Sequence, residues 1–319
     1  MNKTLKSIII SAVIFAASAS LFAASKKSIV CTTFAEYDWV MNILGEKAGS
    51  FDVTLLQNNG TDLHSYQPSV KDIAKISKAD LFVYVGGESD EWVEKVVEQS
   101  VNKNQIVVNM MEVLGDKVRE EEIVEGMQAE EEEEEGEDEE VEYDEHVWLS
   151  LNNAIDLTNA LCKEISKIDS ANASVYTINA VAYTKQLSAL DAEFKAAVKS
   201  AKKNTVLFGD RYPFRYLTDD YGLKYYAAFV GCSAESEASF ETIIFLANKV
   251  DELGLNAVLT IEKSDKKIAK TVVNSTKNKN QQILELDSLQ SITTKEIKAG
   301  RNYLSAMKKN LEVLKKALN

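Results

Sequence analysis

Short apolar runs alternate with longer amphipathic stretches along most of this chain, and this alternation limits the fold more than any other feature. Four runs in the first half predict strands: SIVCTTF, FDVTLLQ, DLFVYVGG and QIVVNMMEV. Four more follow in the second half: NTVLFGD, KYYAAFVGC, AVLTIE and QILELDSL. The stretches between them have helical spacing, and strand alternating with helix indicates parallel sheets covered by helices. The sequence therefore predicts an α/β fold with two parallel-sheet lobes.

One long segment separates the two sets of runs. Residues 172–202 contain no Gly or Pro and keep apolar positions three and four apart, which predicts a helix over ~40 Å long. We expect an N-terminal lobe over residues 25–168, a rigid linker helix over 169–203 and a C-terminal lobe over 204–319. Ligands of open parallel sheets bind where the strands end, so the cleft between the lobes is the expected site.

The N-terminus has the pattern of a secretory signal peptide over residues 1–24. Lys3 and Lys6 precede an apolar run over residues 8–24 that ends in small residues. The run is short for a membrane anchor, and Cys31 follows it too late for a lipoprotein. We expect an exported, soluble protein.

The charge of the chain is strongly acidic. There are 36 Lys and Arg against 50 Asp and Glu, so the net charge of −14 disfavours nucleic acid and anionic lipid as partners and favours cations. Many of the acidic residues lie in residues 119–145, where a block of like charge without apolar periodicity predicts a disordered loop inserted in the first lobe.

Cysteine is scarce. Cys31, Cys162 and Cys232 lie far apart, and an odd number in an exported protein cannot all pair internally. We interpret the three as small buried apolar side chains.

Only two histidines occur, and they hold similar positions. His64 lies in TDLHSYQPS after the second strand run, and His146 enters a helix directly after the acidic segment. Imidazole is the commonest neutral metal donor, so this joint placement favours a metal site. Nearby carboxylates and hydroxyls, such as Asp62 and Asp144, could fix the tautomer of each ring.

Three carboxylates of the second half end strand runs and should meet at one sheet edge: Asp210, Glu262 and Asp287. Imidazole nitrogens combined with carboxylate oxygens suit zinc or manganese better than calcium, which prefers oxygen alone.

Several stretches together resemble the solute-binding proteins of zinc and manganese ABC transporters, and the similarity covers nearly the whole chain after residue 24. They are GTDLHSYQPSVKDIAKISKADLFVYVGGESDEW, DEHVWLSLNNA, the long helix, ILELDSL and YLSAMKKNLEVLKKAL. The resemblance implies a rigid helix between two α/β lobes and a metal site in the interlobe cleft. His64 and His146 correspond to the first two metal ligands, and Asp287 corresponds to a late carboxylate ligand.

The third ligand position departs from this family. Where members have His or Glu, LFGDRYPFRYL places Arg211, which has no lone pair to donate. Asp210 could serve if the loop shifts. Alternatively, Arg211 pairs with a nearby carboxylate, and the shell is completed by another acidic residue: Glu262, Glu235 or Glu237.

We therefore expect a monomeric, non-enzymatic solute-binding protein that carries zinc, or alternatively manganese, to a membrane permease. The acidic segment would collect metal weakly or merely solubilise the chain. A secreted metallohydrolase is a poorer match, since no H-E-x-x-H occurs and two histidines cannot build a histidine-rich dinuclear site. A metal-dependent adhesin or calcium-binding interaction protein would use the acidic segment but leave both histidine loops unexplained.

Overall fold

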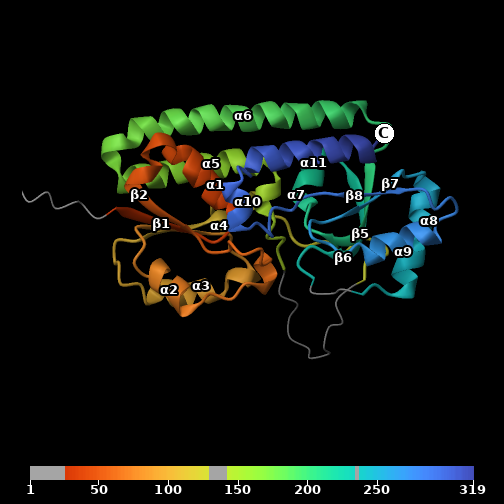
Figure 1. The fold of residues 1–319 in the computed structure, drawn as a ribbon, viewed down its shortest axis with the longest axis horizontal. Helices are drawn as coiled ribbons and strands as arrows, with labels where there is room; N and C mark the ends of the chain where they lie inside the picture. Colours follow the sequence, from red (N-terminus) through yellow and green to blue (C-terminus); the bar gives the residue numbers. More distant parts are fainter. Residues whose placement is uncertain (1–25, 129–141, 234–236) are drawn as a thin grey trace, which may run out of the picture.

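The chain forms two four-stranded parallel sheets side by side (Figure 1). The computed structural model describes residues 26–128, 142–233 and 237–319; the predicted signal segment, residues 1–24, lies outside them. The first sheet has the order β2-β1-β3-β4, with strands β1 (Lys27–Cys31), β2 (Phe51–Leu55), β3 (Leu81–Tyr84) and β4 (Ile106–Asn109). The second has the order β6-β5-β7-β8, with strands β5 (Thr205–Tyr212), β6 (Lys224–Val230), β7 (Ala257–Thr260) and β8 (Gln282–Glu285). The predicted α/β class is confirmed.

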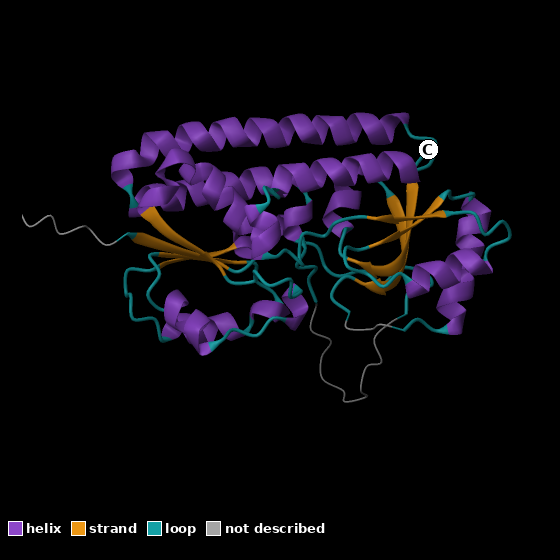
Figure 2. Ribbon diagram, viewed as in Figure 1, coloured by secondary structure: helices purple, strands orange, loops and turns teal. Residues whose placement is uncertain are grey.

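Helices cover both faces of each sheet (Figure 2). Those before the long helix are α1 (Phe34–Leu44), α2 (Val70–Ile76), α3 (Trp92–Glu98), α4 (Met110–Leu114) and α5 (Leu151–Ile168). Those after it are α7 (Arg215–Tyr221), α8 (Phe240–Leu253), α9 (Lys267–Ser275), α10 (Thr294–Lys298) and α11 (Tyr303–Ala317). Because both faces are covered, the central strands β3 and β7 are mostly apolar on both sides. In β3, for example, Leu81 and Val83 enter one core and Phe82 enters another.

The long helix α6 (Ala173–Ser200) has 28 residues and extends over both sheets, with α11 running beside it (Figure 1). The predicted long helix is confirmed, and the closing helix α11 packs beside it and contacts α1 as well as β7 and β8. One continuous apolar core beneath them contains Leu187 and Phe194 of α6, Leu311 of α11, Leu81 of the first sheet and Phe208 of the second. A large rotation between the lobes would have to disrupt this core.

The lobes are also joined through their backbones beside the cleft. Asn59 and Thr293 form an isolated antiparallel bridge, and the Gly60 N–H donates to the Ile292 carbonyl at 3.1 Å. The loop that follows β2 is therefore held against the loop that follows β8.

Strand β5 continues two residues beyond its predicted end. Its register against β6 shifts between Phe208 and Arg211, so that Gly209 and Asp210 oppose the single residue Ala228. Such a bulge redirects the side chains that follow it. Asp210 and Arg211 accordingly lie within an irregular strand end and not in a free loop.

The acidic segment was expected to be irregular throughout, yet its two ends pair. Glu120 and Tyr143 form an antiparallel bridge, and the Asp144 N–H donates to the Arg119 carbonyl at 2.9 Å. The middle of the segment, residues 129–141, lies outside the described residues. Within the described part of the chain, no helix combines the length and apolar content needed to cross a membrane.

Candidate metal centre

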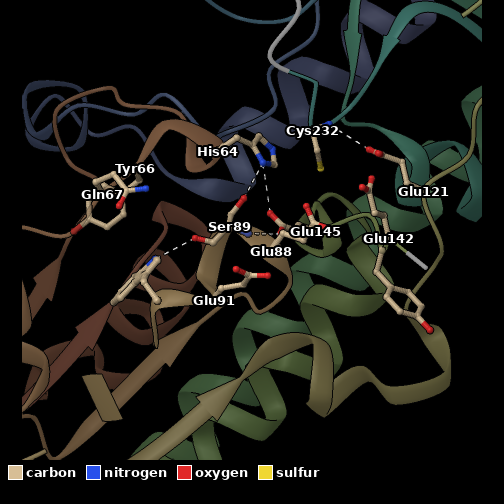
Figure 3. Close-up of a pocket in the computed structure, with 12 residues that line it drawn as sticks. His64, Tyr66, Gln67, Glu88, Ser89, Glu91, Glu121, Glu142, Glu145 and Cys232 are labelled. Atoms are coloured by element: carbon tan, nitrogen blue, oxygen red, sulfur yellow. Dashed lines mark hydrogen bonds and ion pairs between the residues drawn. The ribbon is translucent and has the colours of Figure 1, made fainter. Parts of the chain in front are cut away.

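His64 is held in a short turn between β2 and α2. The turn is a 3-10 helix, Leu63–Ser65, whose N-cap Asp62 accepts from the His64 N–H at 3.2 Å, while Leu63 anchors it in the core. The Ser89 hydroxyl lies 2.9 Å from His64 Nδ1, and the carboxylate of Glu145 lies 3.5 Å from the same atom (Figure 3). With two acceptors at Nδ1, we assign the proton to that nitrogen, which leaves the Nε2 lone pair available.

His146 is fully buried and is fixed by its near neighbour Asp144. Asp144 Oδ1 accepts from the His146 backbone N–H at 2.8 Å and lies 2.9 Å from His146 Nδ1. Behind the ring, a Cβ added at Gly231 would come within 2.9 Å of His146 Cε1. The carboxylate therefore fixes the tautomer with its proton on Nδ1, and the absence of a side chain at Gly231 makes room for the ring.

The two imidazoles present their Nε2 atoms to one point. These atoms are 3.2 Å apart, although the residues are 82 positions apart in sequence. Two nitrogens bound to a tetrahedral zinc at about 2.0–2.1 Å would be about 3.3 Å apart. The pair thus already has the spacing of two zinc ligands.

The surroundings shift the pKa values of the two imidazoles in opposite directions. Burial and the neighbouring His146 lower the pKa of His64 to about 3. Burial also disfavours a charged His146, but the adjacent Asp144 carboxylate outweighs it and raises the pKa of that imidazole. The surroundings therefore favour protonation of His146 over protonation of His64, and a bound cation competes with a proton for His146 Nε2.

A cavity of about 390 Å³ opens beside His64 between the two lobes (Figure 3). Five glutamates line it together with Cys232: Glu88, Glu91, Glu121, Glu142 and Glu145. Burial, and then repulsion by Asp144, raise the pKa of Glu121 to about 7. This concentration of acidic groups favours the entry of cations.

Cys232 was missed as a candidate donor. Its Sγ and the histidine nitrogens form a group in which all donor atoms lie within 4.8 Å of one another. Cys31 and Cys162 are buried as predicted, whereas Cys232 is half-buried and lines the cavity. The signal was present in the sequence, because Cys232 ends a predicted strand in the same way as the three carboxylates.

Those three carboxylates do not belong to the donor group that the described residues form. Glu262 accepts from the Ser288 N–H at 2.7 Å, the Ser288 hydroxyl at 2.8 Å and the Gln290 N–H at 3.2 Å. Its oxygens are thus used to shape the loop after β8. Asp287 forms an ion pair with Arg301, so its predicted role as a ligand would require Arg301 to move away.

Asp210 lies in a neighbouring cavity of about 370 Å³, which Asp62, Arg211 and Glu262 also line. Its Oδ1 accepts from the Arg211 N–H at 2.9 Å, and burial raises the pKa of the carboxyl group. The structure does not bring it into the histidine group, and its role as a ligand stays a prediction.

Arg211 occupies the position of the expected third ligand and connects the two lobes through its guanidinium group. Its Nη2 lies 2.7 Å from Asp62 Oδ2, and its Nη1 donates to the Ser233 carbonyl at 3.3 Å. Of the two alternatives considered for this residue, the structure shows the ion pair. One guanidinium thus ties the turn that carries His64 to the loop that carries Cys232.

Comparison with known proteins points to one family. The family model described as zinc-uptake complex component A, periplasmic, matches residues 29–317. The high-affinity zinc uptake system protein ZnuA of Bacillus subtilis is 30% identical over 295 residues, which are 92% of this chain and 88% of that protein. The zinc-binding protein AdcA of Streptococcus pyogenes is also 30% identical, over 92% of this chain, but the chain spans only 56% of that relative.

Solved structures agree with this assignment. The Zn(II)-bound ZnuA-like domain of Streptococcus pneumoniae AdcA is 29% identical, with a TM-score of 0.70 over 92% of this chain and 99% of that domain. The metal-dependent lipoprotein YcdH of Bacillus subtilis is 26% identical, with a TM-score of 0.73 over 92% of this chain and 99% of its own.

Proposed function

This chain belongs to the family of periplasmic zinc-uptake complex components, and from that premise we propose that it captures Zn²⁺ outside the cytoplasm for an ABC transporter. The observation that carries the proposal is the convergence of His64 Nε2 and His146 Nε2 at 3.2 Å, the spacing of two zinc ligands. Delivery would be to a membrane permease, with the protein acting as a monomer.

The surroundings of both rings support metal capture. Each Nδ1 faces a fixed acceptor, Ser89 or Asp144, so each Nε2 lone pair points toward the shared position without reorganisation. Preorganised outer partners of this kind raise the basicity of the ligand and typically contribute 10–100-fold to metal affinity, as an order of magnitude.

Zinc is favoured over manganese by the donors that converge. Nitrogen and sulfur ligands suit zinc, whereas manganese prefers carboxylate and water oxygens. The acidic cavity would raise the local cation concentration before capture, and the charge of the glutamate-rich residues 129–141 would also attract cations.

Only small movements should accompany binding. The core beneath α6 and α11 is shared by both lobes, and the backbone bridge between Asn59 and Thr293 lies beside the cleft. We expect the turn that carries His64 and the loop that carries Cys232 to shift locally while the lobes keep their relative orientation.

The relatives and the N-terminal sequence support a location outside the cytoplasm. The matching family model describes a periplasmic component, one relative from Streptococcus pneumoniae is named a zinc-binding lipoprotein, and residues 1–24 have the pattern of a signal peptide. We therefore place the mature protein outside the cytoplasm.

Titration calorimetry of the metal-stripped chain without residues 1–24 tests the proposal. We expect one zinc ion per chain, bound more tightly than manganese. His64→Ala and His146→Ala should each weaken zinc binding more than about a hundredfold, because each removes a ligand and not merely an outer partner. Gln67→Ala, an exposed residue at the same cavity, is the matched control and should change little.

Unchanged affinity in both histidine variants would refute the proposal. A further variant lacking residues 129–141 separates it from an adhesin or calcium-binding role. If the deletion variant still binds one zinc ion tightly, the histidine site is supported. If binding is weak, involves several ions and is lost on deletion, the acidic segment and not the histidine pair binds the metal.

A further inference from the structure

Cys232 lies at the carboxyl end of β6, directly across from the two imidazoles. Its Sγ lies within 4.8 Å of a donor nitrogen of each histidine. In Figure 3 the sulfur points into the cavity beside His64, and the backbone N–H of the same residue donates to Glu121 Oε1 at 3.3 Å. The sulfur therefore already faces the position between the two imidazoles.

The backbone on both sides of Cys232 is fixed by the site itself. Gly231 packs against the His146 ring so closely that a Cβ there would meet both Cε1 and Nδ1, at 2.9 and 3.1 Å. On the other side, the Ser233 carbonyl accepts from Arg211, which also holds Asp62 beside His64. Cys232 is therefore held between two contacts that belong to the histidine ligands.

The other two cysteines provide an internal comparison. Cys31 belongs to the apolar core beneath the first sheet, and Cys162 lies on α5 in the same core. Only Cys232, among these three, lines the acidic cavity. A thiol at this position is thus not explained by apolar packing.

We propose that the thiolate of Cys232 is the third zinc ligand, which compensates for the arginine at the expected ligand position. This inference rests on the proposed zinc-binding function and specifies its donor set as two imidazole nitrogens and one sulfur. On binding, the S–H bond breaks, a Zn–S bond forms and the proton leaves to solvent. A tetrahedral site would place the sulfur about 3.6 Å from each nitrogen, so a local shift of the Cys232 loop completes it.

The donor set has consequences for selectivity. Thiolate is a soft ligand that favours zinc over manganese, and its negative charge cancels half the charge of the ion. Three protein donors leave a fourth position that faces the glutamate-lined cavity, where water or a carboxylate completes the tetrahedron.

Cobalt substitution tests the sulfur directly. Co²⁺ bound to thiolate gives an intense charge-transfer absorption in the near ultraviolet, which imidazole and carboxylate ligands do not give. We expect this band in the wild-type protein and in Cys162→Ser, and its loss in Cys232→Ser. Zinc affinity of Cys232→Ser should fall at least about tenfold, since removal of an outer partner already has that effect.

The outcomes separate the two proposals. Failure of the wild-type protein to bind Zn²⁺ or Co²⁺ would overturn the zinc-binding function. Normal binding with a charge-transfer band that persists in Cys232→Ser, or with no band in any variant, would leave that function standing and overturn the role of Cys232.

Alkylation provides a measurement on the unaltered chain. Iodoacetamide labelling followed by peptide mass spectrometry should show Cys232 protected by one equivalent of zinc, with Cys31 and Cys162 labelled slowly in either condition because they are buried. Equal labelling of Cys232 with and without zinc would contradict the assignment.

Discussion

The two sheets have the same strand order, 2-1-3-4 and 6-5-7-8, but they supply different chemistry to the cleft. The first lobe contributes two imidazoles, each with its outer partner already in place. The second contributes an arginine that forms an ion pair with Asp62, and a half-buried thiol. His64, Arg211 and Cys232 lie at strand ends or in the loops that follow, whereas His146 precedes the 3-10 turn before α5.

The difference lies in what surrounds each side chain. Asp144 accepts from the His146 backbone N–H and contacts Nδ1, so it orients the ring and leaves Nε2 without a contact to this carboxylate. Glu262 accepts hydrogen bonds from the loop that contains Ser288, and Asp287 forms an ion pair with Arg301. A carboxylate at a strand end is therefore a candidate ligand only if no nearby N–H group or cation already uses its oxygens.

Acidification should produce the largest effect. The pKa of His146 is raised, because Asp144 outweighs burial, and burial together with Asp144 raises the pKa of the Cys232 thiol. Protonated donors cannot coordinate, so zinc affinity falls as pH falls. Above the pKa of His146, zinc displaces only the thiol proton, and its affinity changes about tenfold per pH unit. Below that pKa zinc also displaces a proton from His146, and its affinity changes about a hundredfold per pH unit.

Calorimetry over a series of pH values checks this dependence. In Cys232→Ser the change in zinc affinity per pH unit should be about tenfold smaller than in the wild type, because no thiol proton is displaced. The control Cys162→Ser should show the pH dependence of the wild type. An affinity that stays flat between about pH 6 and 8 would contradict the assignment of both donors.

Removing an outer carboxylate should have the next largest effect, and only in the first lobe. Asp144→Asn should weaken zinc binding by about 10–100-fold, because the His146 ring loses its charged partner. The matched change Glu262→Gln should leave zinc affinity within about twofold but lower the free energy of unfolding by about 1–3 kcal/mol, since buried donors lose a strong acceptor. A larger loss of affinity in Glu262→Gln would make Glu262 a ligand and reverse the comparison.

Removing the Arg211–Asp62 ion pair between the lobes should have the smallest effect on zinc affinity. Arg211→Gln breaks the pair with Asp62, in which both side chains are 18% exposed, and should lower stability by about 1–2 kcal/mol. Zinc affinity should fall only a few-fold, since no donor is removed. Chemical denaturation and calorimetry measure the two effects, and Arg301→Gln is the control for an ion pair outside the histidine group. Affinity that rises in the control would show that Arg301 withholds Asp287 from the metal.

Much of the fold followed from sequence periodicity alone. Apolar runs with strand spacing marked all eight strands of the described residues, and the stretch without Gly or Pro marked α6 within a few residues. Both are local properties, because a strand buried on two faces and a long helix have distinct spacing whatever they pack against. The return of α11 beside α6 and the bulge in β5 were not predicted, since both depend on contacts with distant elements.

The histidines were identified because the chain has only two and places both at loop-to-helix junctions. The sequence could not rank the remaining donors. Cys232 and Glu262 both end strands, and only the surrounding hydrogen bonds separate a thiol that faces the cavity from a carboxylate that shapes a loop.

Residue type and spacing along the chain were enough to predict the two-sheet α/β class, the long helix and the family, and to make the two imidazoles candidate ligands. Which of the candidate groups meet depends instead on how the chain folds. His64 and His146 approach within 3.2 Å and Arg211 reaches Asp62 across the cleft, through contacts between residues 82 and 149 positions apart. The spacing of residues along the sequence does not predict these distances between side chains, because the distances are set by how the two sheets pack against a shared core.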